Sequence, residues 1–202
     1  MASVSEIAPM PEEFKRPPVR AGDLIAVRYY HGDLIQEGIA KFQKKKWVHI
    51  LWSLGDFGII EANTGGVRWT DLRDYLIRGN CDLLVLRPRR MKIGMASLAV
   101  AYWKGCVKKN DGYSFLGDAR LGLILLGRNL GLGRLAKYLP DNLLLSAHEK
   151  FCSQGGIKGL QEAGAISSHV DSFDWWPSRI AADTANFEHV ALWIGHHGRW
   201  ME

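Results

Sequence analysis

The stretch WVHILWSLGDFGIIEANTG, residues 47–65, restricts the fold more than any other part of the chain. Two runs of β-branched and aromatic residues flank a turn at Gly55-Asp56, and this pattern predicts a β-hairpin. If the turn is centred there, the residue numbers of cross-strand partners add up to about 110 or 111. We therefore expect His49 on the first strand to face Glu61 on the second, or its immediate neighbour.

His49 and Glu61 each interrupt an otherwise apolar run. A half-buried polar side chain needs a hydrogen-bond partner, and each of these two residues can supply the partner of the other. A histidine held by a carboxylate is the arrangement that a general base requires. A purely structural His–Glu hydrogen bond is the alternative interpretation of the same pattern.

The rest of the chain reads as strands followed by helices and a last strand, which predicts an α+β domain. Residues 1–20 are rich in proline and charge and predict an extended arm, and residues 21–202 are expected to form a single domain. The sequence HHGRWME reads as a polar tail in which His196 and His197 are solvated. Strands are predicted from residue 22, in 81–88 and before 195, and residues 66–76 read as a strand edge with a helical turn. Helices are predicted in 33–46, 92–108, 116–145, from 152 onwards and shortly before the last strand.

Composition and charge narrow the classes of function. The three cysteines are an odd number without short spacings, which argues against a disulfide framework and a metal site, so we expect no cofactor. A net charge of +5 favours anionic surroundings such as cell-wall polymer or lipid headgroups. In the absence of a recognisable motif we expect no nucleic-acid partner. The first residues show no apolar leader and the run 121–127 is too short to span a bilayer, so the expectation is a protein made in the cytoplasm, with membrane contact left open.

Cys152 is the cysteine whose position suits a nucleophile. It precedes a run with helical periodicity, and the N-terminus of a helix stabilises a thiolate and offers N–H groups to an oxyanion. Cys81 opens an apolar strand and Cys106 lies inside a helix, so we expect both to be packing residues. A buried core thiol remains the alternative for Cys152. The hypothesis assigns Cys152 as nucleophile, His49 as base and Glu61 as the residue that orients the base.

Eight short motifs in this order resemble the circularly permuted papain-like cysteine peptidases of the NlpC type (YiiX-like): GDLIAV, WVHILWSLGD, IIEANTGGV, LRDYL, VLRP, YSF, FCSQ and PSRIA. The resemblance implies a papain-like fold with an antiparallel sheet packed against helices. It gives His49, Glu61 and Cys152 the roles above, and implies that Tyr113 and Ser153 line the site or assist the oxyanion. The chain departs from the family where Val48 replaces a serine and where QGG follows Cys152-Ser153.

The activity implied by the resemblance is hydrolysis of an amide through an acyl-enzyme. The expected substrate is a peptide of peptidoglycan, and the expected setting is a phage- or prophage-encoded enzyme carried in a virion beside phage structural proteins. One alternative is an acyl hydrolase or acyltransferase acting on lipid or thioester at a membrane surface, suggested by the Leu-rich segment 116–145. Another is a catalytically silent, papain-like structural or binding component of a larger assembly, suggested by the eight tryptophans and the arm 1–20.

Overall fold

The computed structural model describes residues 17–30, 47–63, 66–109, 112–113, 149–150, 152–169 and 175–201. Within these ranges the chain forms a seven-stranded antiparallel sheet, a pair of two-residue strands and four α-helices. The predicted α+β class is therefore confirmed. The helices predicted in 33–46 and 116–145, and most of the arm, lie outside the described residues.

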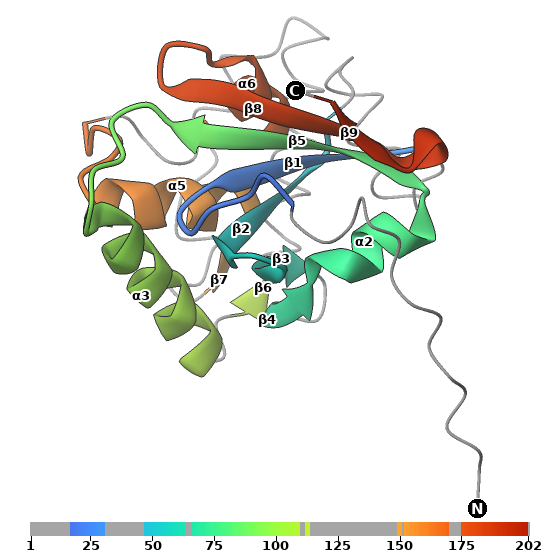
Figure 1. Ribbon diagram of the computed structural model, residues 1–202. Helices are drawn as coiled ribbons and strands as arrows, with labels where there is room; N and C mark the ends of the chain where they lie inside the picture. The colour runs from blue at the N-terminus through green and yellow to red at the C-terminus, as the bar shows by residue number, and fades with distance from the viewer. Residues whose placement is uncertain are drawn as a thin grey trace, which may run out of the picture.

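The large sheet has the strand order β4-β3-β2-β1-β5-β8-β9, and all of its neighbouring strands run antiparallel (Figure 1). Most of the predicted elements are present within a few residues of their expected bounds. The strands are β1 (Leu24–Tyr29), β2 (His49–Gly55), β3 (Gly58–Asn63), β4 (Gly66–Asp71), β5 (Cys81–Pro88), β8 (Phe187–Ile194) and β9 (Arg199–Met201); β6 (Gly112–Tyr113) and β7 (Glu149–Lys150) form the separate pair; the helices are α2 (Leu72–Arg78), α3 (Met95–Lys108), α5 (Cys152–Glu162) and α6 (Pro177–Ala182).

The predicted hairpin is present as β2 and β3, but its predicted register is wrong. Glu61 lies opposite Leu51, not opposite His49 or its immediate neighbour. The pairing shifts between Ser53 and Gly55, and Asp56 adopts a positive φ of 48° in the turn. An irregularity of this kind changes the count of residues in the loop, so a register counted back from an ideal tight turn fails.

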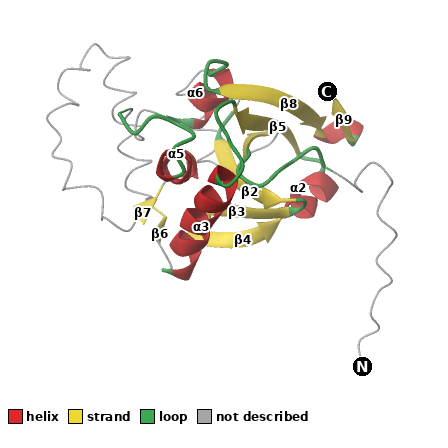
Figure 2. Ribbon diagram, turned by 60° about the vertical axis from the view of Figure 1, so that its left-hand side comes forward, coloured by secondary structure: helices red, strands yellow, loops and turns green. Residues whose placement is uncertain are grey.

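Helices cover both faces of the sheet. Apolar side chains of α3, α5 and α6 pack with Leu24, Trp52 and Ile60 on one face, whereas Leu72 and Leu76 of α2 pack with residues of the other face. Figure 2 shows α3 and α5 side by side, with α2 at the far end of the strands. The two aromatic rings of Trp52 and Trp103 stack at 6.0 Å between the sheet and these two helices. No helix in the described ranges is long and apolar enough to cross a membrane.

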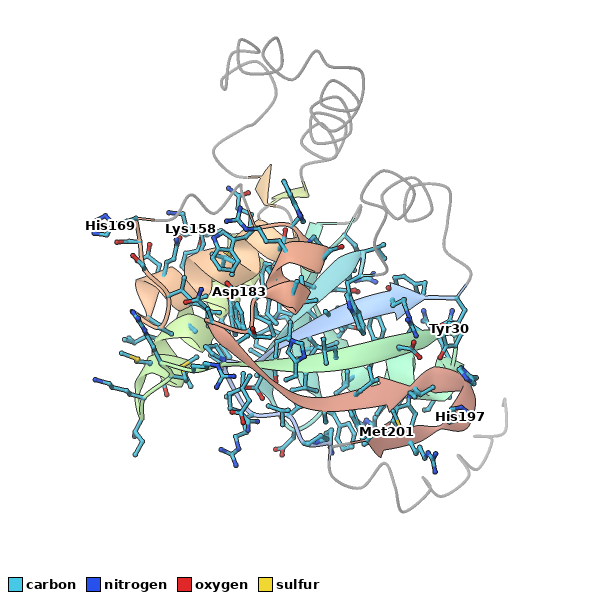
Figure 3. The ribbon with its side chains drawn as sticks, turned by 90° about the horizontal axis from the view of Figure 1, so that it is seen from above. Tyr30, Lys158, His169, Asp183, His197 and Met201 are labelled. Atoms are coloured by element: carbon cyan, nitrogen blue, oxygen red, sulfur yellow. The ribbon has the colours of Figure 1, made fainter. Side chains whose placement is uncertain are left out.

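The C-terminal residues are more ordered than the predicted polar tail. A 3₁₀ turn, η5 (Gly195–His197), leads into β9, which adds an edge strand to the sheet. Tyr30 donates its hydroxyl to the buried Asp82, and His196 Nδ1 lies 2.8 Å from the Tyr30 hydroxyl. Figure 3 shows Tyr30 at the same end of the molecule as His197 and Met201. His196 and His197 are exposed, as predicted.

Candidate active site

Cys152 is the first residue of α5, and its side chain is buried with 6 % of the residue exposed. The helix is held at this end by Trp52, whose indole N–H donates to the carbonyl oxygen of Cys152 at 2.6 Å. Gly155 allows the close approach, because a Cβ atom at that position would lie 2.3 Å from the Trp52 ring. Packing and this hydrogen bond therefore fix the position of α5 relative to β2. The first N–H groups of a helix have no partner within the helix, so those next to Cys152 can bind another acceptor.

His49 is the first residue of β2, and its side chain is 12 % exposed. It hydrogen-bonds to the side chain of Cys152 and lies beside Glu61. Burial of the imidazole acts against its charged form. Interactions with the Cys152 side chain and with the Glu61 carboxylate outweigh this effect and raise the pKa of His49 to about 10. The surroundings thus favour an imidazolium beside the Glu61 carboxylate.

Glu61 is a buried carboxylate with a full set of donors. Its Oε2 lies 3.6 Å from His49 Nε2 and accepts a short hydrogen bond from the Tyr75 hydroxyl. Its Oε1 accepts from Arg68 Nη2 at 2.7 Å, from Arg68 Nε at 2.9 Å and from Asn63 Nδ2 at 3.2 Å. Burial alone would raise the pKa of Glu61, but the charge of His49 at 3.6 Å and the hydrogen bonds from Tyr75 and Arg68 lower it to about 2. The carboxylate is therefore ionised over the whole physiological range.

The predicted approach of His49 to Glu61 is confirmed although the register was wrong. Residues that are diagonal on adjacent antiparallel strands still share a face of the sheet and remain within reach of long side chains. Glu61, His49 and Cys152 consequently form a continuous line of contacts from a carboxylate through an imidazole to a thiol. This arrangement can hold the imidazole in one orientation and exchange a proton with the sulfur.

The other two cysteines lie in the core. Cys81 is fully buried at the start of β5, where desolvation and the neighbouring Asp82 raise the pKa of its thiol to about 12. Cys106 is 4 % exposed and faces the core from α3. Both positions agree with the predicted packing role, and the raised pKa makes Cys81 a poor nucleophile.

Three further residues are connected to the start of α5. Ser153 and Gln154 follow Cys152 in the chain, and Tyr113 is linked to this region through a strand pair. Tyr113 pairs with Lys150 in the parallel β6–β7 ladder, two residues before Cys152. Ser153 is buried in the first turn of α5, and so is Gln154, whose Oε1 atom has no hydrogen-bond partner among the described residues. The assignment of Tyr113 and Ser153 to the oxyanion or to the lining of the site stays a prediction.

Several residues of the site were not found from the sequence. Arg68 lies directly opposite Glu61 on β4, and a register counted from the β3–β4 turn would have indicated it. Tyr75 comes from α2, and its hydroxyl also interacts with Tyr29 of β1. Trp52 belongs to the apolar run that predicts the first strand of the hairpin. No local sequence signal pairs Tyr75 with Glu61 or Trp52 with Cys152, because these contacts depend on how α2 and α5 pack.

The described part of the chain has no group of three or more His, Cys, Asp or Glu side chains placed to hold a metal ion. The chain matches no model of a known protein family and no curated protein sequence.

Proposed function

We propose that the protein is a cysteine hydrolase with a circularly permuted papain-like fold, cleaving an amide bond through an acyl-enzyme. The observation that carries the proposal is the contact of His49 with both Cys152 and Glu61. The order of these residues along the chain, with histidine before cysteine, supports the permuted arrangement. The antiparallel sheet with the cysteine helix packed against β2 and β3 supports the same fold.

Each residue has one task in the proposed reaction. The Cys152 thiolate attacks the carbonyl carbon, and the N-terminal N–H groups of α5 stabilise the oxyanion that forms. His49 gives its proton to the leaving nitrogen, the C–N bond breaks, and an amine departs. Neutral His49 then takes a proton from water, the resulting hydroxide adds to the thioester, and the C–S bond breaks. A carboxylic acid is released, and Cys152 and His49 return to their starting charges.

Glu61 keeps the imidazole oriented throughout this cycle. Its pKa of about 2 means that it stays ionised while His49 gains and loses its proton. Arg68 and Tyr75 fix the carboxylate by donating to its two oxygens. They are positioning residues, since they act on the reacting atoms only through Glu61 and His49.

The proposed substrate is a peptide amide of peptidoglycan, and the proposed setting is a virion-associated cell-wall hydrolase. The resemblance of the motif series to NlpC-type peptidases and the basic charge of the chain support this choice. A peptide amide and an ester or thioester of an acyl chain differ in the leaving group that departs from the carbonyl carbon. The same residues would therefore also cleave a lipid or thioester substrate.

Digestion of purified peptidoglycan with the full chain tests the proposal. The products are separated by liquid chromatography, and mass spectrometry identifies new amine and carboxyl ends. We expect new ends with the wild type and with Cys106→Ala, and none with Cys152→Ala. If the wild type releases no more ends than Cys152→Ala, peptidoglycan is not the substrate.

One observation favours the catalytically silent alternative, namely the 6 % exposure of Cys152. A silent component would keep a buried thiol that no small electrophile modifies selectively. Labelling of Cys152 by a small alkylating reagent, described in the Discussion, therefore separates an inert thiol from an active enzyme whose substrate has been wrongly assigned.

A further inference from the structure

Positive charge is concentrated in one part of the fold. Between Leu83 and Lys109 the chain carries seven Lys and Arg residues and no Asp or Glu. Because the whole chain has a net charge of +5, the remainder carries a net negative charge. Arg87 forms an ion pair with the buried Asp23 at 2.9 Å. The other six cations are exposed: Arg89, Arg90, Lys92, Lys104, Lys108 and Lys109.

Large apolar side chains are exposed within the same region. Ile93, in the loop between β5 and α3, is 107 % exposed, and Leu98 in the first turn of α3 is 57 % exposed. Trp69 on the neighbouring edge strand β4 is 49 % exposed, and Lys104 Nζ lies 5.5 Å from the centre of its ring. Single exposed apolar residues are common, but here aliphatic side chains project from among a group of cations.

The orientation of α3 explains why these residues face outward together. Ala99, Trp103 and Cys106 point into the core and are buried, so the opposite side of the helix carries Leu98 and Lys104 towards solvent. Figure 1 shows α3 and the loop that leads into it at the edge of the molecule, away from β9. We call the β5–α3 loop together with the outward side of α3 the α3 surface.

We propose that the α3 surface docks on an anionic lipid bilayer, with Ile93 and Leu98 entering the boundary of the acyl chains and the surrounding cations contacting headgroups. Interfacial proteins combine these two features, because buried aliphatic area and attraction to anionic lipid add to each other. Tryptophan at the rim, as at Trp69, suits the headgroup level. A nucleic acid or wall polymer would use the cations but has no place for a protruding isoleucine.

Docking in this way would hold the catalytic helix close to the membrane. The Trp103 indole N–H of α3 donates to the carbonyl oxygen of Gly155 at 3.1 Å, so α3 is joined directly to the helix that begins with Cys152. The inference about docking does not depend on the thiol chemistry, since it rests on the charge and exposure of the α3 surface alone.

Co-sedimentation of the full chain with vesicles tests the proposal. One set of vesicles contains equal parts of phosphatidylglycerol and phosphatidylcholine, and the other contains phosphatidylcholine alone. We expect the wild type to bind the anionic vesicles at low salt and to bind the neutral vesicles at least tenfold more weakly. The double variant Ile93→Ser/Leu98→Ser should lose about tenfold or more in partitioning into the anionic vesicles. Charge reversal by Arg90→Glu/Lys92→Glu should lose at least as much.

Ile77→Ser is the matched control, because Ile77 is a 70 % exposed isoleucine on α2, outside the α3 surface. It should bind as the wild type does. Circular dichroism of every variant shows whether the fold is kept. Absence of wild-type binding would overturn the proposal. So would binding that survives Ile93→Ser/Leu98→Ser, because it would reflect charge alone, as for a nucleic acid or wall polymer.

Discussion

The indole N–H of Trp52 donates to the carbonyl oxygen of Cys152 at 2.6 Å, joining residues that are 100 positions apart in the sequence. Trp52 lies on the same strand as His49, three residues further along. One strand therefore carries both the proposed base and the residue that holds the helix of the proposed nucleophile. The relative position of imidazole and thiol depends on this shared strand more than on the loops between the elements.

Alkylation of Cys152 by iodoacetamide at neutral pH should depend on His49. The thiolate is the reactive species, and the adjacent imidazolium stabilises it. We expect His49→Ala to slow the alkylation of Cys152 roughly a hundredfold, within the range typical of a lost acid–base partner. Mass spectrometry of the peptides at successive times measures the alkylated fraction of each cysteine, which gives a separate rate for each.

Cys81 and Cys106 provide the internal control for this measurement, because both are buried and burial raises the pKa of Cys81 to about 12. They should react slowly in the wild type and in His49→Ala alike. Equal rates at all three cysteines, or a Cys152 rate that His49→Ala leaves unchanged, would mean that the thiol is a packing residue and would remove the enzymatic proposal.

Local signals in the sequence were sufficient for the longer strands and for the position of Cys152. Alternation of apolar residues and the Gly55-Asp56 turn located β2 and β3, and the apolar run from residue 152 located α5. The register failed because the irregularity at Ser53–Gly55 is not visible in residue types. His49 and Glu61 could still be paired, since the contact tolerates a diagonal offset on one face of the sheet.

Contacts between elements that are distant in the chain could not be predicted. Tyr75 reaches Glu61 because α2 packs against one face of the sheet. The strand β9 has only three residues, too few to show an alternation of apolar and polar side chains. The sequence QGG after Ser153 is one of the departures from the family motif. The structure gives part of it a packing cause, because Gly155 and Gly156 both lie against Trp52.

Gly155→Ala should destabilise the fold and disturb the site. A methyl group there would lie 2.3 Å from Trp52, which has to shift from its hydrogen bond with Cys152. We expect a loss of at least about 1–3 kcal/mol in the free energy of unfolding. Chemical denaturation followed by circular dichroism measures it, and Cys152 alkylation should slow as well.

Gly105→Ala is the control for this substitution, because it also places alanine within a helix but meets no atom within 4 Å. It should stabilise the protein by about 0.5–1 kcal/mol, the ordinary gain of alanine over glycine in a helix. A Gly155→Ala protein as stable as Gly105→Ala would contradict the tight Trp52 packing.

Tyr75→Phe should weaken the site through Glu61. It removes a hydroxyl that donates to the buried carboxylate, and a hydrogen bond to a charged group contributes about 1.5–3 kcal/mol to stability. We expect this loss in unfolding experiments together with slower alkylation of Cys152, because His49 is less firmly oriented.

Tyr30→Phe is the control that separates the loss of stability from the effect on Cys152 alkylation. It also removes a tyrosine hydroxyl from a buried carboxylate, that of Asp82 at the opposite end of β1 from the α5 packing. It should cost stability and leave the alkylation rate of Cys152 unchanged. If both variants slow alkylation equally, the effect of Tyr75 is general loosening of the fold.

The pH dependence of stability should carry the signature of the His49–Glu61 pair. The pKa of His49 is raised from 6.5 to about 10, so folded His49 holds its proton more tightly than unfolded His49. Its contribution is complete below pH 6.5 and is lost as the pH rises towards 10. The pKa of Glu61 is lowered from 4.5 to about 2, so its contribution is complete above pH 4.5 and is lost as the pH falls towards 2.

Both contributions are therefore complete between pH 4.5 and 6.5. Denaturation of the wild type and of His49→Gln across the pH range gives the difference in their free energies of unfolding, which measures the contribution of His49. The difference should be largest in that window and should shrink between pH 6.5 and 10. Because interactions with Cys152 contribute to the raised pKa of His49, the same comparison in a Cys152→Ala background should show a smaller difference that ends at a lower pH. A difference that is flat with pH, or that grows above pH 7, would mean that His49 is neutral in the folded protein, and the imidazolium–carboxylate pair would have to be abandoned.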